Sequence, residues 1–276
     1  MTNHKKLISK NVEDFYNQAS EETRLENGMG IFEFERVKEL IKKHLHKPNM
    51  VILDVGGGTG KYSEWLSDLG HKVYLVEPVM KHIKLAQKRA KKSKNGFSVK
   101  VGASQQLDYP NKFADIILLH GPLYHLQNPK DRAQTISESM RVLKSGGTVL
   151  GFAINYTAST LVGLLHGYIH DKNFFNMCKE ELTSSNHFPP KQFPGLMGEA
   201  YYHRPEELKR EFQQAGFTHN LLTAVEGMTW LDKDYFSSML HPKNKKTLSE
   251  LLSITENDEN LLAFSPHMMI ASKKPN

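Results

Sequence analysis

Cysteine is almost absent from this chain, since Cys178 stands alone in 276 residues. A single cysteine excludes an internal disulfide and is typical of a protein of the reducing cytosol. Long apolar runs are missing too. The most apolar stretch, residues 158–169, is interrupted by His166 and by glycines, and it falls short of the roughly 20 residues that span a bilayer. The first residues carry charge but no apolar segment of a secretory signal. We therefore expect a cytoplasmic protein that does not enter a membrane.

Charge of one sign is concentrated in a single segment. The net charge is +6, and residues 80–95, "MKHIKLAQKRAKKSKN", contain seven lysines and arginines. The apolar residues of this segment recur at helical spacing, which predicts an amphipathic helix with a basic outer face. Such a face can bind nucleic acid, but no recognised RNA-binding module accompanies it. The pattern favours a solvated helix face and gives little support to a nucleic-acid partner.

Apolar runs of strand length alternate with helical segments through the middle of the chain. The expected strands span residues 49–55, 71–78, 97–103, 113–120, 148–154, 218–227 and 267–274. Asn128 and Pro129 begin one of the intervening helices as N-cap and first residue, and "SGG" at 145–147 ends it. Strands joined by crossover helices form a parallel sheet that is covered on both faces. Ligands bind to such sheets at the carboxyl ends of the strands.

The organisation expected from this alternation is a single core with additions. Residues 1–45 look helical and form a cap, and residues 46–154 form the ligand-binding core. Residues 155–203 interrupt the alternation and are expected to form an inserted lid over the site. Residues 204–276 complete the sheet, and their segment 228–262 is expected to shape the substrate pocket.

A glycine-rich loop follows the first expected strand in "DVGGGTGKYSEW", residues 54–65. A triphosphate loop requires G-x-x-x-x-G-K-[ST], but Tyr62 replaces the hydroxyl residue and Val55 stands at the first glycine position. A dinucleotide loop requires G-x-G-x-x-G, and its third position is occupied here by Lys61 or Ser63. The loop therefore does not fit a triphosphate and fits a dinucleotide poorly.

Two carboxylates indicate what the loop can hold instead. Asp54 ends the first strand, where it would repel a pyrophosphate and suit a cation such as the ammonium group of an amino acid. Glu77 ends the second strand, about 21 residues after Gly56, where a carboxylate accepts hydrogen bonds from ribose hydroxyls. S-adenosylmethionine carries both groups, a positive sulfonium between them, and no phosphate.

The stretch from Asp54 to Glu77, together with "MRVLKSGGTVL" (140–150), resembles the class I S-adenosylmethionine-dependent methyltransferases. "DFYNQASEETRL" near the N-terminus, "LLHGPLYHL" (118–126) and "YYHRPEELKREFQQAGF" (201–217) are similar to a subset of uncharacterised bacterial members. The resemblance covers residues 14–154 and 200–227. It implies an α/β, Rossmann-like, doubly wound fold with a mostly parallel seven-stranded sheet, whose last strand is antiparallel.

The resemblance also implies which residues bind S-adenosylmethionine and its product, S-adenosylhomocysteine. Members of the family often place an aspartate after the third strand to bind the adenine amino group, but Ala103 stands there, so Ser104 or Gln105 must substitute. Val79 would join Pro78 in lining the adenine slot. The implied cofactor-binding residues are Tyr16, Arg24, Asp54, Gly56, Gly58, Thr59, Glu77, Pro78, Ser104, Gln105, His120 and Gly121.

A general base is needed for methyl transfer only if the nucleophile carries a proton. His120, Tyr124 and His125 are the candidates, because "HGPLYHL" places them beside the expected methyl group. A loop histidine that bonds to nearby backbone is the alternative for His125. His166 and His170 have the i, i+4 spacing of a zinc helix, but the segment supplies no glutamate between them and no third ligand. We therefore expect no metal.

The sequence predicts a methyltransferase that acts on a small-molecule acceptor. An RNA or protein methyltransferase is the alternative within the same chemistry, although "HGPL" replaces the D/N-P-P-Y type of motif found in enzymes that methylate exocyclic amines of nucleic acids. A regulator that binds S-adenosylmethionine without turnover and a nicotinamide-dependent oxidoreductase are alternatives from other classes. The acceptor and the oligomeric state are open at this level.

Overall fold

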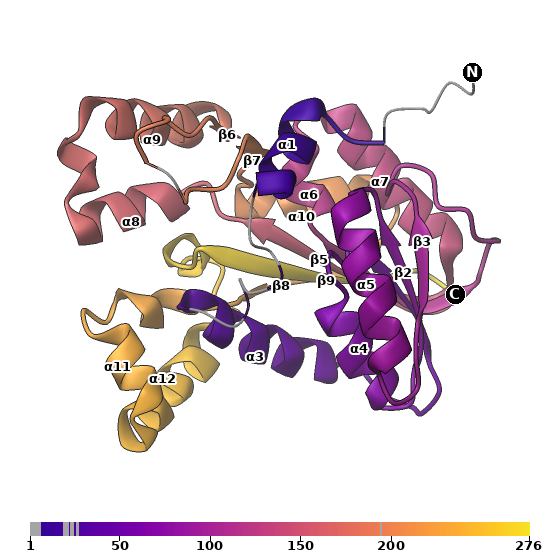
Figure 1. Cartoon of the computed structure of the whole chain (residues 1–276). Coiled ribbons are helices and arrows are strands. Elements are labelled where there is room, and N and C mark those ends of the chain that lie inside the picture. The colour runs from indigo at the N-terminus through magenta and orange to yellow at the C-terminus, as the bar shows by residue number, and fades with distance from the viewer. Residues whose placement is uncertain (1–6, 19–21, 23–24, 26–27, 194) are drawn as a thin grey trace.

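The computed structural model of the chain describes residues 7–18, 22, 25, 28–193 and 195–276. A seven-stranded sheet lies between layers of helices in this part of the chain (Figure 1). Its strand order is β3-β2-β1-β4-β5-β9-β8. The strands are β1 Val51–Val55, β2 Lys72–Glu77, β3 Ser98–Val101, β4 Ala114–His120, β5 Leu143–Ile154, β8 Thr218–Ala224 and β9 His267–Lys273. A separate two-stranded sheet pairs β6 (Asn186–His187) with β7 (Ala200–Tyr201).

The helices fall into four groups along the chain. The helices before the sheet are α1 Lys10–Gln18 and α3 Met29–Lys42. Those that connect or follow core strands are α4 Lys61–Asp68, α5 Met80–Lys92, α6 Pro122–His125, α7 Pro129–Val142 and α10 Pro205–Gln214. The insertion contains α8 Ala158–His166, η1 Tyr168–His170 and α9 Lys172–Ser184. The segment between β8 and β9 contains η2 Gly227–Leu231, α11 Tyr235–Leu240, α12 Pro242–Thr255 and η3 Leu262–Phe264.

The pairing of the strands confirms the predicted sheet. β1 pairs in parallel with both β2 and β4, and β4 pairs in parallel with β5. β9, the last strand, is antiparallel to both of its neighbours, β5 and β8. The chain first builds outward from β1 through β2 to β3 and then returns to place β4 on the other side of β1. This reversal brings the loops after β1 and β4 side by side, at the point where such sheets bind ligands.

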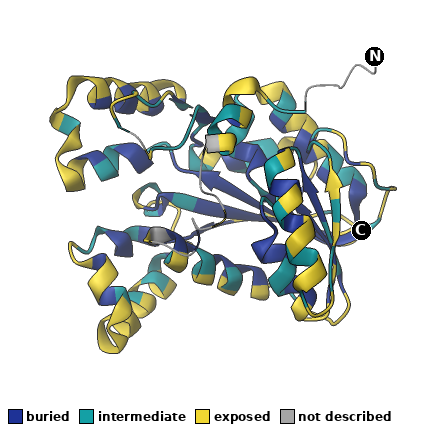
Figure 2. Ribbon diagram, viewed as in Figure 1, coloured by how far each residue is buried: buried dark blue, intermediate teal, exposed yellow. Residues whose placement is uncertain are grey.

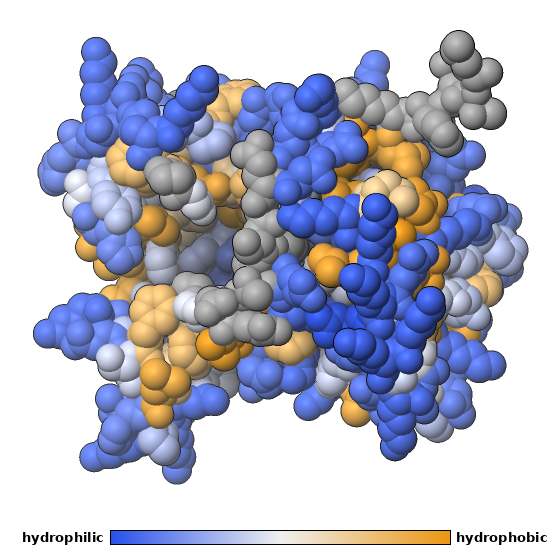
Figure 3. All heavy atoms as spheres, viewed as in Figure 1, coloured by the Kyte–Doolittle hydropathy of each residue, from blue (hydrophilic) through white to orange (hydrophobic). Residues whose placement is uncertain are grey.

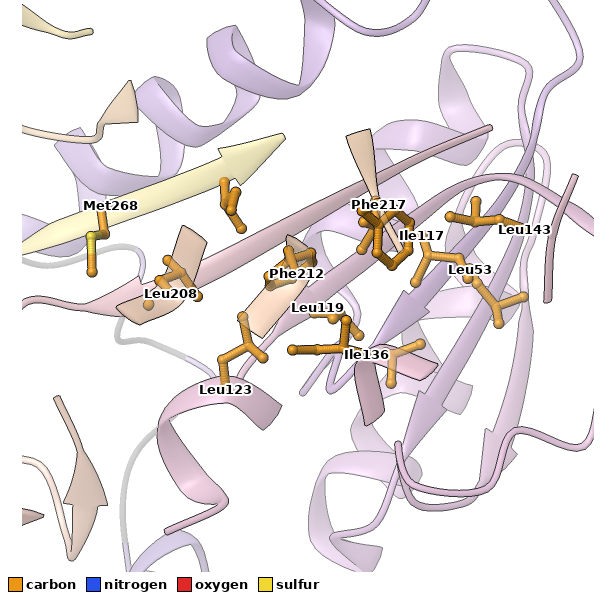
Figure 4. Packing of buried hydrophobic residues seen from close by; sticks show 14 of the residues in the cluster. Leu53, Ile117, Leu119, Leu123, Ile136, Leu143, Leu208, Phe212, Phe217 and Met268 are labelled. Carbon is orange, nitrogen blue, oxygen red and sulfur yellow. The ribbon is translucent and has the colours of Figure 1, made fainter. Parts of the chain in front are cut away.

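Apolar side chains that alternate along the strands hold the helices on both faces of the sheet. One face packs Leu53, Ile117 and Leu119 against α6, α7 and α10, through side chains such as Ile136 and Phe212 (Figure 4). The opposite face packs the next residues along the same strands against α3 and α4. Figure 2 shows the result, with buried strands at the centre and exposed residues on the outer sides of the helices.

The start of β5 differs most from the sequence prediction. We expected "SGG" at 145–147 to end a helix and the strand to begin at residue 148, but α7 ends at Val142 and β5 begins at Leu143. The register along β4 shifts between Ala114, which pairs with Leu143, and Ile116, which pairs with Thr148. Gly146, with φ of 71°, lies in this irregular part. Glycines therefore accommodate a bulge inside the strand, which a local pattern cannot distinguish from a helix end.

The two histidines with zinc-helix spacing do not share a helix. α8 ends at His166, Gly167 has a left-handed conformation with φ of 76°, and His170 lies in the 3-10 turn η1. Among the described residues no group of three or more histidines, cysteines, aspartates or glutamates could hold a metal ion. The described helices also include none that is long and apolar enough to cross a bilayer.

The basic segment forms α5. In Figure 3 the surface over this helix is largely hydrophilic. Two of its cations have partners within the chain. The Lys81 ammonium group donates to the backbone oxygens of Tyr16 and Asn17, 3.2 and 3.0 Å away. The Arg89 guanidinium donates to the backbone oxygen of Thr59 and to Glu64. Lys81 and Arg89 therefore attach α5 to the end of α1 and to the glycine loop. These two charges have a structural role and do not by themselves indicate a nucleic-acid surface.

Candidate functional site

A pocket lies where the loops after β1, β2, β3 and β4 meet, at the carboxyl edge of the sheet. It contains about 950 Å³ of empty space, counting the solvent at its mouth, which is in the range of small-molecule sites. We call it the glycine-loop pocket. Of the residues predicted to bind the cofactor, those on its wall are Tyr16, Gly56, Gly58, Thr59, Glu77, Pro78, Ser104, Gln105, His120 and Gly121. Arg24 lies outside the described residues.

Two residues of the glycine loop require glycine for different reasons. Gly56 has φ of 77°, and a Cβ there would lie 2.6 Å from the backbone oxygen of His120. Gly58 has φ of 55°, and a Cβ there would meet nothing within 4 Å. The first glycine therefore allows the loops after β1 and β4 to touch, whereas the second supplies a backbone conformation that favours glycine.

Glu77 ends β2 with its carboxylate in the pocket wall and only 4% of the residue exposed. Oε2 accepts from the backbone N–H of Gly58 at 3.1 Å, and Oε1 accepts from that of Val79 at 2.9 Å. His82 Nδ1 lies 3.3 Å from Oε1. Each carboxylate oxygen can accept more than one hydrogen bond. Glu77 therefore fixes the loop and still has acceptor capacity for two hydroxyl groups.

Asp54 lies behind the glycine loop, and the described wall of the pocket does not include it. It is fully buried, and Oδ2 accepts from the Ser63 hydroxyl at 2.6 Å. Oδ1 is buried without a hydrogen-bond partner among the described residues. Burial raises the pKa of Asp54 to about 6, and the charge of Glu77 adds to this while the Ser63 hydrogen bond opposes it. Direct contact of Asp54 with a ligand cation stays a prediction. Its hydrogen bond with Ser63 joins the end of β1 to α4, behind the glycine loop.

The raised pKa of Asp54 predicts a pH dependence of stability. Because the folded-state pKa of about 6 lies above the ordinary value of 3.8, the folded chain binds the proton more tightly, and ionisation costs stability as pH rises from about 4 to above 6. At roughly 1.4 kcal/mol per pKa unit, the free energy of unfolding should fall by about 3 kcal/mol over this range, relative to Asp54→Asn. Urea unfolding of both proteins from pH 4 to pH 8 measures this.

Asp68→Asn is the control, because Asp68 is exposed at the end of the same helix that carries Ser63. Since an exposed carboxylate is not removed from water by folding, Asp68→Asn should not show the fall in the free energy of unfolding that burial causes at Asp54. If the free energy of unfolding of Asp54→Asn, relative to the wild type, were also constant with pH, this prediction would be wrong, and burial of an ionised Asp54 would not destabilise the fold.

The region expected to receive the adenine is built by the turn after β3. Ser104 and Gln105 line the pocket there beside Ala103. The Ser104 hydroxyl lies 2.9 Å from the Thr135 hydroxyl of α7 and is 7% exposed as a residue. The same hydroxyl also lies 3.4 Å from Gln105 Oε1, so both side chains have partners, and the substitution of Ser104 or Gln105 for the missing aspartate stays a prediction.

Four aromatic rings join the N-terminal helix to the loop after β4. The Tyr16 hydroxyl lies 2.6 Å from His125 Nε2, and its ring makes edge contacts with the rings of His125 and His82. Tyr124 packs on His125 from the same short helix, α6. Lys81 holds the end of α1 in place. α1 therefore closes one side of the pocket with Tyr16.

The three predicted base candidates differ in their surroundings. Burial lowers the pKa of His125 to about 3, with a smaller contribution from the charge of His82, so its ring is neutral at physiological pH and binds a proton weakly. His120 is stacked between the rings of Tyr62 and Phe152, with centroid distances of 4.9 and 4.4 Å. These surroundings favour a role for His125 as a neutral hydrogen-bond partner of Tyr16, and for His120 as part of a wall.

A second pocket adjoins the first. It contains about 490 Å³ of empty space, counting the solvent at its mouth, and Tyr16, His120 and Tyr124 belong to the walls of both pockets. We call it the adjoining pocket. The rest of its wall is mainly apolar, with two polar exceptions, Glu33 and His267. The complete described wall is Tyr16, Glu33, Val37, His120, Tyr124, Phe152, Ala153, Ile154, Met197, Val225 and His267.

Several wall residues were not anticipated from the sequence. Lys61 and His82 line the glycine-loop pocket, and Glu33 and His267 line the adjoining one. Lys61 directly follows the loop as the first residue of α4, so its position could have marked it as a partner for a ligand carboxylate. Met197 comes from the insertion. Trp230, Tyr235 and Phe236, which could have lined a pocket, pack instead against η3 and α3.

Comparison with known proteins agrees with this geometry. Residues 53–151, which contain the glycine loop, Glu77 and the loop after β4, match the family described as a methyltransferase domain. Residues 53–151 are thus a methyltransferase domain of the class I, S-adenosylmethionine-dependent type. Such a domain implies S-adenosylmethionine as the methyl donor.

A curated methyltransferase from Pelagibacter ubique, named ubiquinone biosynthesis O-methyltransferase, is 31% identical over 133 residues, which are 48% of this chain and 54% of the relative. The chain thus spans about half the length of the curated relatives it matches.

Solved methyltransferases share the fold. A S-adenosylmethionine-dependent methyltransferase from Methanosarcina mazei aligns with a TM-score of 0.58 at 20% identity, covering 86% of this chain and 97% of the other. Haemonchus contortus phosphoethanolamine N-methyltransferase 2, in complex with S-adenosyl-L-methionine, aligns with a TM-score of 0.55 at 16% identity, covering 96% of this chain and 60% of the other.

The residues of the glycine-loop pocket fit S-adenosylmethionine. The Glu77 carboxylate has acceptor capacity for the ribose hydroxyls, and the open space beside Gly58 leaves the backbone accessible to a ligand. Lys61 supplies a cation near the loop for the ligand carboxylate, while Pro78 and Val79 offer apolar surface near Gln105 for the base. The pocket thus presents a complementary group for each end of this cofactor.

Proposed function

We propose that the chain transfers a methyl group from S-adenosylmethionine to a small molecule that is held in the adjoining pocket. The observation that carries the proposal is the wall of Tyr16, His120 and Tyr124 that the two pockets share. A group bound against this wall from the adjoining pocket meets the cofactor at its methionine end, because the loop after β4 lies beside the glycine loop.

The residues of the chain act mainly by positioning. When bound, S-adenosylmethionine supplies an electrophilic methyl group on a positive sulfur. Glu77 and the glycine loop orient the nucleoside end, and α1 excludes water on the side of Tyr16. Phe152, Ile154 and Val225 give the acceptor an apolar surface. Orientation of this kind can supply several kcal/mol of barrier lowering, roughly 7–11 at best.

The proposal is tested by binding and turnover on the intact chain. Calorimetry should show binding of S-adenosylmethionine and S-adenosylhomocysteine, and much weaker binding of NADH and ATP, because the glycine loop lacks the pattern of a dinucleotide loop or a triphosphate loop. Incubation with S-adenosylmethionine and a small-molecule metabolite extract should release S-adenosylhomocysteine and yield a product heavier by one methyl group. Cofactor binding without any release would favour a regulator without catalysis, and tighter binding of NADH would overturn the proposal.

A further inference from the structure

A glutamate–histidine pair lies at the end of the adjoining pocket, formed by two segments far apart in the sequence. Glu226 follows β8, and His267 is the first residue of β9. Glu226 Oε1 lies 2.7 Å from His267 Nδ1, and Oε2 accepts from the backbone N–H of His267 at 3.1 Å. Glu226 is 3% exposed, whereas the side chain of His267 is 35% exposed.

The pair fixes the protonation pattern of the imidazole ring. A carboxylate oxygen only accepts hydrogen bonds, so Nδ1 of His267 must donate and therefore carries the proton. When the ring is neutral, Nε2 therefore carries the lone pair, as in a histidine that serves as a base. The buried Glu226, with its backbone donor, is held in place and would stabilise the ring when Nε2 takes a proton.

The pair is placed where an acceptor would bind. His267 lies opposite Ile154 in the register of β9 with β5, and both residues belong to the wall of the adjoining pocket. The titratable groups around it are Glu226, Glu33 of α3, and Tyr16, His120 and Tyr124 of the shared wall. Arg36 of α3 donates to the backbone oxygen of Val225. Burial raises the pKa of Tyr235 of α11, and the nearby charge of Glu226 adds to this.

The apolar surroundings of the adjoining pocket affect the protonation of a bound acceptor, and therefore whether methyl transfer needs a general base. An apolar environment favours the neutral form of a bound group, which lowers the pKa of an ammonium and raises that of a hydroxyl. Burial would therefore favour loss of the extra proton of an amine, with the Glu33 carboxylate of the same wall opposing it, whereas a hydroxyl would keep its proton and stay a weak nucleophile. A base in this pocket is useful chiefly to a hydroxyl.

We propose that His267, oriented by Glu226, is the general base for O-methylation of a small, largely apolar phenol in the adjoining pocket. In this step the O–H bond breaks and the proton passes to Nε2 of His267. The oxygen electron pair forms a bond to the methyl carbon, and the carbon–sulfur bond breaks with its electrons left on sulfur. The products are a methyl ether, S-adenosylhomocysteine and an imidazolium paired with Glu226, which returns its proton to solvent. This inference rests on the proposed function.

The test uses simple phenols with pKa near 10 as acceptor probes, with anilines and thiophenols of matched size beside them. S-adenosylhomocysteine release is measured from pH 6.5 to pH 10 for the wild type, His267→Gln, Glu226→Gln and the control His166→Gln, whose histidine is exposed at the end of α8. His267→Gln should lower kcat/KM for phenols about 10²–10⁴-fold at pH 7. This loss should shrink toward pH 10, where solvent ionises the phenol. Glu226→Gln should show a smaller loss with the same trend.

Calorimetry with S-adenosylhomocysteine separates this inference from the proposed function. Both variants should bind it as the wild type does, and His166→Gln should match the wild type throughout. Three results would each contradict the role of His267 as general base. The first is a wild-type rate in His267→Gln at pH 7, and the second is a loss of activity that is constant with pH. The third is a wild type that methylates anilines or thiophenols but no phenol. A wild type that binds neither S-adenosylmethionine nor its product would instead overturn the proposed function.

Discussion

Replacement of Glu77 by alanine is expected to lower the affinity for S-adenosylhomocysteine about 100-fold or more. The carboxylate is nearly fully buried in the wall of the glycine-loop pocket and is available to two ribose hydroxyls. A hydrogen bond to a charged group contributes about 1.5–3 kcal/mol, and every 1.4 kcal/mol changes an equilibrium tenfold. Loss of two such bonds therefore predicts at least this change. Calorimetric titration of the variant measures it.

Glu77 also holds the loop, so the experiment needs controls. Glu77→Gln keeps the size of the side chain but loses the charge and one acceptor oxygen, and should bind with intermediate affinity. Glu250→Gln removes an exposed carboxylate of α12 and should leave affinity unchanged. Unimpaired binding by Glu77→Ala would contradict the assignment of the pocket to a nucleoside.

A methyl group at Gly56 is expected to do much more damage than one at Gly58. Both glycines have positive φ, which costs another residue roughly 1–2 kcal/mol. At Gly56 the new Cβ would also lie 2.6 Å from His120 O and 2.8 Å from Pro122 Cδ, and such overpacking typically adds 1–3 kcal/mol. Gly56→Ala should therefore lose about 3 kcal/mol or more of stability, together with cofactor binding.

Gly58→Ala serves as the matched control, because its Cβ would meet nothing within 4 Å. It should lose no more than about 2 kcal/mol, although the methyl group could still obstruct the ligand. Urea unfolding of the two variants and the wild type gives the comparison. Equal losses of stability in the two variants would show that the close contact between the loops after β1 and β4 adds nothing to the cost of a methyl group at Gly56.

The position of Asp54 shows how far a motif can be interpreted locally. The sequence places a carboxylate at the end of β1, beside the glycines, and this is where the structure has it. Side chains alternate along a strand, so Asp54 faces α4 with Ile52 while Leu53 and Val55 face the other layer. Its contact with Ser63 depends on how α4 packs on the sheet, and the pattern of glycines does not report this.

The bulge at the start of β5 has a similar cause. Glycines end helices and also occupy bulges, so "SGG" after a helical segment is ambiguous. The register of β5 with β4 resolves it, since Leu143 already pairs with Ala114. Pairing between strands is a tertiary contact, and a boundary that depends on it cannot be predicted from one segment.

The sequence by itself determined the sheet, the loop that faces its carboxyl edge, and the distance from Gly56 to Glu77, because strand alternation and glycine spacing are local properties. Only the tertiary structure brought Glu226 and His267, 41 residues apart along the chain, to one end of the adjoining pocket. The antiparallel pairing of β9 with β5 and β8 does this. That pairing is fixed by packing over the whole sheet, so neither segment by itself predicts that Glu226 and His267 meet.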